Sequence, residues 1–280
     1  MNALEIRGLT KDYGAFCLRN LNLRLPSGCI LGLIGENGAG KSTTIKLILD
    51  MIRKDEGTVT ILGQDNQKNL PLLKQDIGVV LDEVGIPECL TPLQVGKIMA
   101  GTFTRWEDGL YRQYLGRFSL PEKKPFKELS KGMKMKLGLA VALSHHPRLL
   151  ILDEATAGLD PVVREEILDI LTDFTREESH SVLISSHIVS DLEKICDYIA
   201  ILHQGELLLC EEKDRLLETY GLLSCTREQL EDLEPGAVLG KKISPYGVQA
   251  LVRRDLVPAG WNVSPVNTEE LFIFLVKERG

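Results

Sequence analysis

The stretch Gly35-Glu36-Asn37-Gly38-Ala39-Gly40-Lys41-Ser42 decides the fold of this chain. It matches the pattern G-x-x-x-x-G-K-[ST] of a phosphate-binding P-loop. The apolar run at residues 29–34 precedes it and predicts a short buried strand. Residues 43–49 follow, with apolar side chains at helical spacing. The sequence therefore predicts a strand, a tight glycine turn and the start of a helix, which is the context that a P-loop requires.

Each residue type in this loop has a chemical reason. Glycine lets the backbone adopt conformations that a Cβ forbids, so main-chain N–H groups can surround an anion. The N–H groups at the start of the following helix add to the same anion site. Lys41 would reach the β- and γ-phosphates of a nucleotide, and the Ser42 hydroxyl would hold Mg²⁺. By itself the loop predicts nucleotide binding and leaves open how the energy is used.

The composition is that of an ordinary globular protein. The 280 residues are 44% apolar and 26% charged, which suggests one large domain or two unequal ones. The formal net charge of −7 gives no basic excess, so we expect no nucleic-acid partner. Six cysteines form no C-x-x-C pair, which favours buried thiols in a reducing cytosol. We expect no signal peptide, and no apolar run approaches the ~20 residues that span a bilayer.

Two adjacent carboxylates follow the apolar run at residues 149–152. In a P-loop protein the first carboxylate at such a strand end holds Mg²⁺, so we assign this role to Asp153. Glu154 can polarise the water that attacks the γ-phosphate. His187 stands at the end of a predicted buried strand at 182–186, and its place at the same edge of a parallel sheet favours a functional role.

Three further signals are weaker. Tyr13 lies in a predicted turn, where it can stack on an adenine ring or be a half-buried turn tyrosine. Asp82 and Glu83 follow the apolar run at 77–81, where they can serve Mg²⁺, a catalytic water or a partner's surface, or form a solvated loop. Ser130 is expected to cap a helix, and Gly132 permits an anion to approach its N-terminus.

We predict an α/β fold with a P-loop NTPase core and a mainly parallel sheet. It carries an N-terminal antiparallel β subdomain, an ATP-binding domain at 1–220 that includes a helical subdomain at about 84–145, and a small C-terminal α+β appendage at 221–280. The pattern weakens in this appendage, where we expect no recognisable chemistry. Local signals predict a helix start at Thr91-Pro92, helices at 161–178, 211–219, 227–233 and 269–278, and a strand at 248–252.

In their order and spacing, five motifs resemble the ATP-binding subunit of ABC transporters over about residues 2–215. They are the P-loop, Leu-Ser-Lys-Gly-Met at 129–133, Asp153-Glu154, residues 157–160 and His187. The resemblance implies ATP hydrolysis, in which Glu154 is the general base, His187 contacts the γ-phosphate and Lys41 assists with its charge. Metal ligands would be Ser42, Asp153 and Asp82. The residues implied to bind ATP are Tyr13, Gly35, Glu36, Asn37, Gly38, Ala39, Gly40, Lys41, Ser42, Thr43, Ser130 and Gly132.

The resemblance also implies partners. Two copies of the chain, or this chain and a paralogue, would pack head to tail. Each ATP would then lie between the P-loop of one chain and the Ser130 region of the other, and Asp160 would help to couple the two sites. Separate transmembrane permease subunits would dock near residues 82–106 and hold the chain on the cytoplasmic face of the cell membrane. The single cassette is most like bacterial exporters of the ABC-2 type.

Two positions depart from the family pattern. The usual signature is Leu-Ser-Gly-Gly-Gln, so Lys131 adds a positive charge near the phosphate and Met133 cannot hydrogen-bond as glutamine would. The family also places a Mg²⁺-contacting glutamine about where Asp82 stands, with Glu83 as the alternative. We therefore expect the dimer site to survive with altered contacts between subunits.

Two rival functions remain open at this point. A soluble ABC-type ATPase acting on ribosomes or DNA would need no permease, but such proteins usually have two cassettes or a long coiled-coil insertion. This chain has one P-loop and no sustained heptads. A nucleotide-binding regulator without turnover is disfavoured because Glu154 and His187 are both present.

Overall fold

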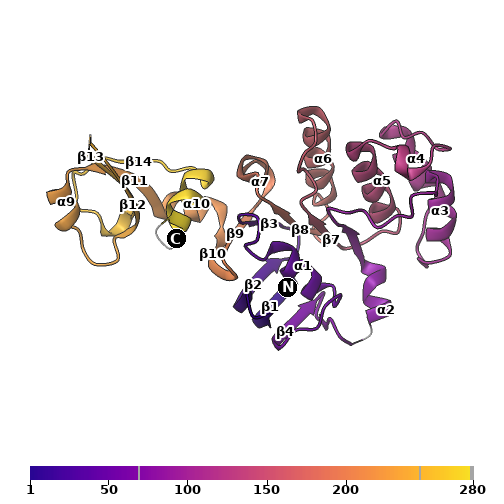
Figure 1. Cartoon of the computed structure of the whole chain (residues 1–280), viewed down its shortest axis with the longest axis horizontal. Helices are drawn as coiled ribbons and strands as arrows, with labels where there is room; N and C mark the ends of the chain where they lie inside the picture. The colour runs from indigo at the N-terminus through magenta and orange to yellow at the C-terminus, as the bar shows by residue number, and fades with distance from the viewer. Residues whose placement is uncertain (69, 246, 278–280) are drawn as a thin grey trace.

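The central sheet carries the P-loop and organises the molecule (Figure 1). The computed structural model describes residues 1–68, 70–245 and 247–277. Five neighbouring strands are parallel, and β10 joins one edge antiparallel, in the order β10-β9-β3-β8-β7-β6. The strands are β3 (Ile30–Ile34), β6 (Ile77–Val80), β7 (Leu149–Asp153), β8 (Ser181–Ser186), β9 (Tyr198–His203) and β10 (Glu206–Glu212). The prediction of a mainly parallel sheet is confirmed.

Both faces of this sheet are covered, which explains its nearly continuous apolar strands. Every residue of β3, β7 and β8 is buried. In β3, Ile30 and Ile34 belong to a core packed with helices of one face. Leu31 and Leu33 belong to a second core on the opposite face, with the P-loop helix and the N-terminal sheet. The helices are α1 (Lys41–Ile48), α6 (Pro161–Phe174), α7 (Val189–Ile195) and α8 (Lys213–Thr219).

The N-terminal sheet is antiparallel in its described pairings, as predicted. Its order is β2-β1-β4-β5, with β1 (Asn2–Asp12), β2 (Cys17–Pro26), β4 (Glu56–Ile61) and β5 (Gln64–Asp65). In β2 the leucines at 21, 23 and 25 are buried, whereas Asn22 and Arg24 are exposed. This alternation is that of a strand with one face on a core and one face in water.

The helical segment lies beyond the β6 edge of the central sheet (Figure 1). It contains α3 (Pro92–Ala100), α4 (Asp108–Arg117), η2 (Phe126–Glu128) and α5 (Lys131–Leu143), and α2 (Leu70–Leu73) and η1 (Lys74–Asp76) precede β6. Thr91 caps α3 as predicted, since its hydroxyl accepts from the Gln94 amide and the Gln94 side chain accepts from the Thr91 amide. These reciprocal bonds fix the start of the helix that follows the loop after β6.

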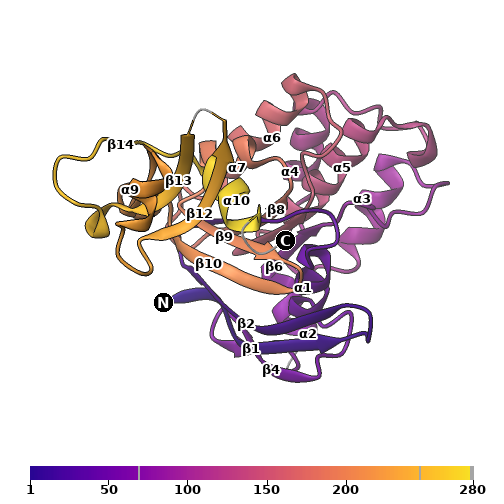
Figure 2. The same ribbon diagram turned by 60° about the vertical axis from the view of Figure 1, so that its left-hand side comes forward.

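The C-terminal residues form a third sheet, in the order β12-β13-β11-β14 (Figure 2). The predicted strand at 248–252 lies within β13, and the final helix is confirmed as far as Lys277, because Glu278 lies outside the described residues. The elements are β11 (Tyr220–Cys225), α9 (Arg227–Glu231), β12 (Val238–Ser244), β13 (Gly247–Arg253), η3 (Arg254–Leu256), β14 (Val263–Ser264) and α10 (Thr268–Lys277). Helix α10 is not isolated from the main body, since Leu271 and Phe274 join the core that includes Leu192 of α7.

The turn between β9 and β10 ties the P-loop to the N-terminal sheet. The Gly205 amide donates to the Ala39 carbonyl, and the Gly205 carbonyl accepts from the Arg19 amide. Gly205 has φ +82°, and a Cβ there would lie 2.0 Å from the Cys17 carbonyl oxygen. We expect Gly205→Ala to lower the free energy of unfolding by roughly 2–3 kcal/mol, measured by urea titration.

Gly63→Ala is the matched control for Gly205→Ala. Gly63 has φ +81°, but no atom in the described part of the chain lies within 4 Å of its added Cβ, so Gly63→Ala should cost only the backbone strain of roughly 1–2 kcal/mol. Equal losses in the two variants would show that the contact with Cys17 has no energetic importance.

Candidate functional site

The P-loop follows β3 directly and ends where α1 begins. Gly38 and Gly40 have φ of +86° and +112°, in the left-handed region that favours glycine. A Cβ on Gly35 would lie 2.6 Å from the Leu202 carbonyl oxygen, so this glycine lets the loop cross β9. No atom of the described residues lies within 4 Å of a Cβ placed on Gly38, which leaves the loop open on that side.

A cavity of about 500 Å³ opens above this loop. Besides the loop itself it is lined by Thr43 of α1, by Phe16 and by the two carboxylates Asp82 and Glu154. These carboxylates come from the residues that follow β6 and β7, whose C-terminal ends meet at the same edge of the parallel sheet. Of the loop residues, the lining ones are Glu36, Asn37, Gly38, Gly40, Lys41 and Ser42.

Lys41 is held inside the loop that precedes it. Its side chain is 5% exposed, and Nζ donates to the carbonyl oxygens of Gly35 at 2.7 Å and Glu36 at 3.2 Å. Nζ also lies 3.0 Å from Oε1 of Glu154. The lysine therefore joins the phosphate loop to the carboxylate at the end of β7.

Glu154 lies between two basic side chains. Its Oε2 lies 2.7 Å from Nδ1 of His187 and accepts a hydrogen bond from that nitrogen in the tautomer with a proton on Nδ1. Its other oxygen, Oε1, faces Lys41. Burial raises the pKa of Glu154, but the close ammonium group of Lys41, and then the hydrogen bond and charge of His187, outweigh burial and hold the pKa below its usual value. The carboxylate is thus ionised at neutral pH, as a general base must be.

The backbone at Glu154 is also specialised. Its φ is +52°, a conformation that non-glycine residues seldom adopt. The Glu154 amide donates to the carbonyl and hydroxyl oxygens of Ser185, each at 3.1 Å. These bonds to β8 hold the bend that turns the carboxylate toward the cavity.

Asp153 lies one residue earlier and is almost fully buried, with 4% of its surface exposed. Its Oδ1 accepts a 2.6 Å hydrogen bond from the Ser185 hydroxyl. Oε1 of Glu154 is buried and accepts no hydrogen bond within the described chain, the Lys41 contact being an ion pair outside hydrogen-bond geometry. The oxygen groups at this edge include the Ser42 hydroxyl and the carboxylates of Asp82, Asp153 and Glu154. That set suits Mg²⁺, which usually takes one or two carboxylates and completes its shell with phosphates and water.

The structure brings together some of the predicted site residues and leaves others apart. Asp82 lines the cavity, and Glu83 is not among the residues that line it. Ser130 caps α5 by accepting from the Met133 amide, but neither it nor Gly132 lines the P-loop cavity. Asp160 caps α6 in the same way, accepting from the Val163 amide.

The aromatic wall of the cavity comes from Phe16, which the sequence analysis did not single out. Its Cζ lies 2.9 Å from where a Cβ on Gly40 would be, and it also lines a neighbouring cavity of about 550 Å³. Tyr13 is 52% exposed and lines neither cavity, with Lys11 Nζ 5.4 Å from its ring centre. The available signal was a second aromatic residue three positions after Tyr13 in the same loop.

Comparison with known proteins agrees with this geometry. Residues 18–157 match the family described as ABC transporter. The chain is 31% identical to the ABC transporter ATP-binding protein YtrB of Bacillus subtilis, over 96% of this chain and 97% of that protein. It is 35% identical to the bacitracin transport ATP-binding protein BcrA of Enterococcus faecalis, over 73% of this chain and 68% of that protein. A solved ATP-binding subunit of an ABC transporter has a TM-score of 0.70 at 27% identity, over 76% of this chain and 91% of that one.

The chain therefore belongs to the ABC transporter family. It is an ATP-binding subunit that hydrolyses ATP and energises an ABC exporter. ABC ATPases dimerise and associate with transmembrane permease subunits. Within the part of the chain that the structure describes, no helix is long and apolar enough to cross a membrane.

Proposed function

We propose that two copies of this chain, or this chain and a paralogue, close head to tail on two ATP molecules and drive export through separate permease subunits. The observation that carries the proposal is the division of the site. Lys41 and Glu154 line one cavity and His187 contacts Glu154, whereas Ser130 and Gly132, at the start of α5, are not among the residues that line it. A second chain would complete the cavity with its own Ser130 region, and Asp160 would lie near the contact.

In this proposal the Ser42 hydroxyl, Asp153 and Asp82 would hold Mg²⁺ together with the phosphates. When bound, the ion neutralises charge that develops on the β- and γ-phosphate oxygens. Glu154 accepts a proton from the attacking water, and His187 steadies the Glu154 carboxylate at 2.7 Å. Lys41 and the loop amides, Asn37 to Thr43 among them, bind the triphosphate.

We assign the adenine contact to Tyr13, as its exposed ring can cover a base, while Phe16 lines the cavity itself. Tyr13→Ala should weaken ATP binding about ten-fold, because stacking of a base on an aromatic ring contributes about 1–3 kcal/mol. The affinity is measured by titration with ATP, and free triphosphate should bind the variant as it binds the wild type. If Phe16→Ala alone lowers the ATP affinity, the base stacks on Phe16 instead.

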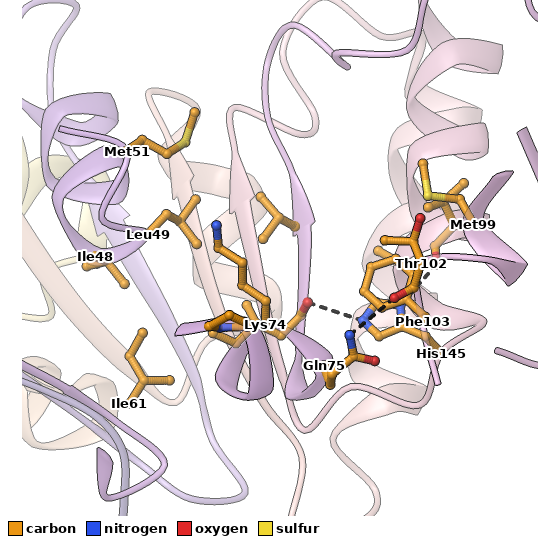
Figure 3. A pocket seen from close by; sticks show the side chains of 15 residues that line it. Ile48, Leu49, Met51, Ile61, Lys74, Gln75, Met99, Thr102, Phe103 and His145 are labelled. Atoms are coloured by element: carbon orange, nitrogen blue, oxygen red, sulfur yellow. Dashed lines mark hydrogen bonds between the residues drawn. The ribbon is translucent and has the colours of Figure 1, made fainter. Parts of the chain in front are cut away.

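An apolar groove at the C-terminal end of α1 supports the permease part of the proposal (Figure 3). It encloses about 650 Å³ between the end of α1 and the helical segment. Figure 3 shows Leu49 and Met51 on one wall, Phe103 on the other and Lys74 between them. We propose that a short amphipathic helix of the permease, with apolar side chains and a carboxylate for Lys74, docks here. This would hold the chain on the cytoplasmic face of the cell membrane.

Met51→Glu tests this docking. Met51 is 55% exposed, so the change should leave folding and ATP binding intact while it places a charge in an apolar groove. We expect the chain purified from membranes to lose its permease partner. Ile243→Glu is the matched control, since Ile243 is 52% exposed on β12 and is not part of the groove. Recovery of wild-type chain with ribosomes and without a membrane protein would contradict the proposal.

A further inference from the structure

Lys131 links α5, the helix that begins in the signature motif at 129–133, to the nucleotide cavity of its own chain. It is the first residue of α5, directly after the capping Ser130. Its Nζ lies 3.7 Å from Oδ1 of Asp82, which lines the P-loop cavity. The same Nζ lies 3.3 Å from the position of a Cβ on Gly158, in the bend that follows Glu154. One side chain therefore forms an ion pair with the loop after β6 and lies beside the loop after β7.

The contact between Lys131 and Asp82 matters because of the other charged side chains around the cavity. Among the described residues three carboxylates line the cavity, and each has a basic side chain beside it. Glu154 lies against Lys41, Glu36 lies 3.4 Å from Nδ1 of His203, and Asp82 lies against Lys131. An ATP triphosphate is strongly negative, so any carboxylate on the wall repels it unless a cation offsets the charge.

We propose that Lys131 is a positioning residue for the nucleotide site of its own chain. Its ammonium group holds the Asp82 carboxylate at the mouth of the P-loop cavity and offsets the charge that this carboxylate presents to the triphosphate. The pair also fastens the start of α5 to the loop after β6, so the helix that carries Ser130 moves together with the wall of the cavity. This inference rests on ATP occupying that cavity. It explains the two departures from the family pattern at Lys131 and Asp82 by the contact between them.

The pair is half exposed, with 51% and 54% of the two side chains accessible, so its effect is modest and is best measured as a coupling. The probe is a fluorescent ATP analogue bound to the full chain in EDTA, which removes any contribution of Asp82 to Mg²⁺ binding. Lys131→Met should weaken binding about three-fold at low salt. Lys131→Arg, which keeps the charge, should bind as the wild type does. In ~1 M salt, where charges act over only ~3 Å of solvent, the loss should shrink toward zero.

The decisive comparison uses Asp82→Asn. In that background Lys131→Met should have no effect, because the charge that Lys131 offsets is gone. The same three-fold loss with and without Asp82 would overturn the proposal, since Lys131 would then act on the nucleotide directly. No loss in the wild-type background would overturn it as well. Lys127→Met is the control, since Lys127 is exposed on η2 and makes no ion pair within the described residues.

Two further readouts separate this proposal from the others. The thermal unfolding midpoints of all variants should match that of Lys127→Met, which shows that folding is unchanged. If Lys131→Met does not fold, Lys131→Gln replaces it. Binding of the analogue by the wild-type chain tests the nucleotide site itself. If the wild type binds and the coupling is absent, only the role of Lys131 is lost, and the dimer and permease proposals stand.

Discussion

Glu154→Gln should bind ATP as the wild type does and hydrolyse it about a hundred-fold to ten-thousand-fold more slowly. Positioned general bases contribute rate factors of this size. Glutamine keeps the shape of the side chain and cannot take a proton from water. We expect single-turnover assays to show the loss in the chemical step, and size-exclusion chromatography in ATP to show accumulation of a dimer.

The control for this variant is Glu122→Gln, an exposed carboxylate before η2 for which the described chain shows no ion pair. It should hydrolyse ATP at the wild-type rate. Hydrolysis by Glu154→Gln at the wild-type rate would remove Glu154 from the mechanism. A loss of ATP affinity in the same variant would instead show that the carboxylate mainly holds Lys41, whose Nζ lies 3.0 Å away.

Lys41→Ala should abolish hydrolysis and weaken ATP binding roughly ten-fold to a hundred-fold, because a hydrogen bond to a charged group contributes about 1.5–3 kcal/mol. The buried ammonium also keeps Glu154 ionised, so its removal should raise the pKa of that carboxyl from its lowered value. NMR titration of the Glu154 carboxyl group in the wild type and in the variant measures this change in pKa. Isothermal titration with ATP measures the affinity directly.

Lys46→Ala is the matched control for Lys41→Ala. Lys46 lies on the same helix but is exposed and lines neither the P-loop cavity nor the apolar groove. Its removal should leave ATP affinity unchanged. Full ATP affinity in Lys41→Ala would refute the phosphate role of this lysine.

Local signals predicted much of the fold and of the site. The strand, glycine turn and helix around the P-loop were predictable because backbone conformation and apolar spacing are short-range properties. The pair Asp153-Glu154 was assigned to a strand end for the same reason. The cap at Ser130 was also predictable, since a single side chain and the next turn of helix decide it.

Features that depend on distant packing escaped prediction. The predicted helix at 161–178 is too long, because α6 ends at Phe174. There the Thr175 hydroxyl donates a hydrogen bond to the Leu171 carbonyl oxygen, and His180 stacks on Phe174. The segment at 211–219 was only partly helical, since β10 continues to Glu212. In the third sheet, β12 has mostly exposed or half-buried residues, so its sequence lacks an apolar period. The contacts of Phe16 and Lys131 join segments far apart in the chain.

The apolar groove and the nucleotide cavity share no lining residue among those described. If the permease docks in the groove as proposed, a compound that fills the groove would compete with the permease and not with ATP. Its inhibition of transport would be independent of ATP concentration, whereas nucleotide analogues must overcome the ATP already present in a cell. Because the groove walls are ordinary apolar side chains rather than a phosphate-binding motif, such a compound could also distinguish this chain from other ATPases with a P-loop.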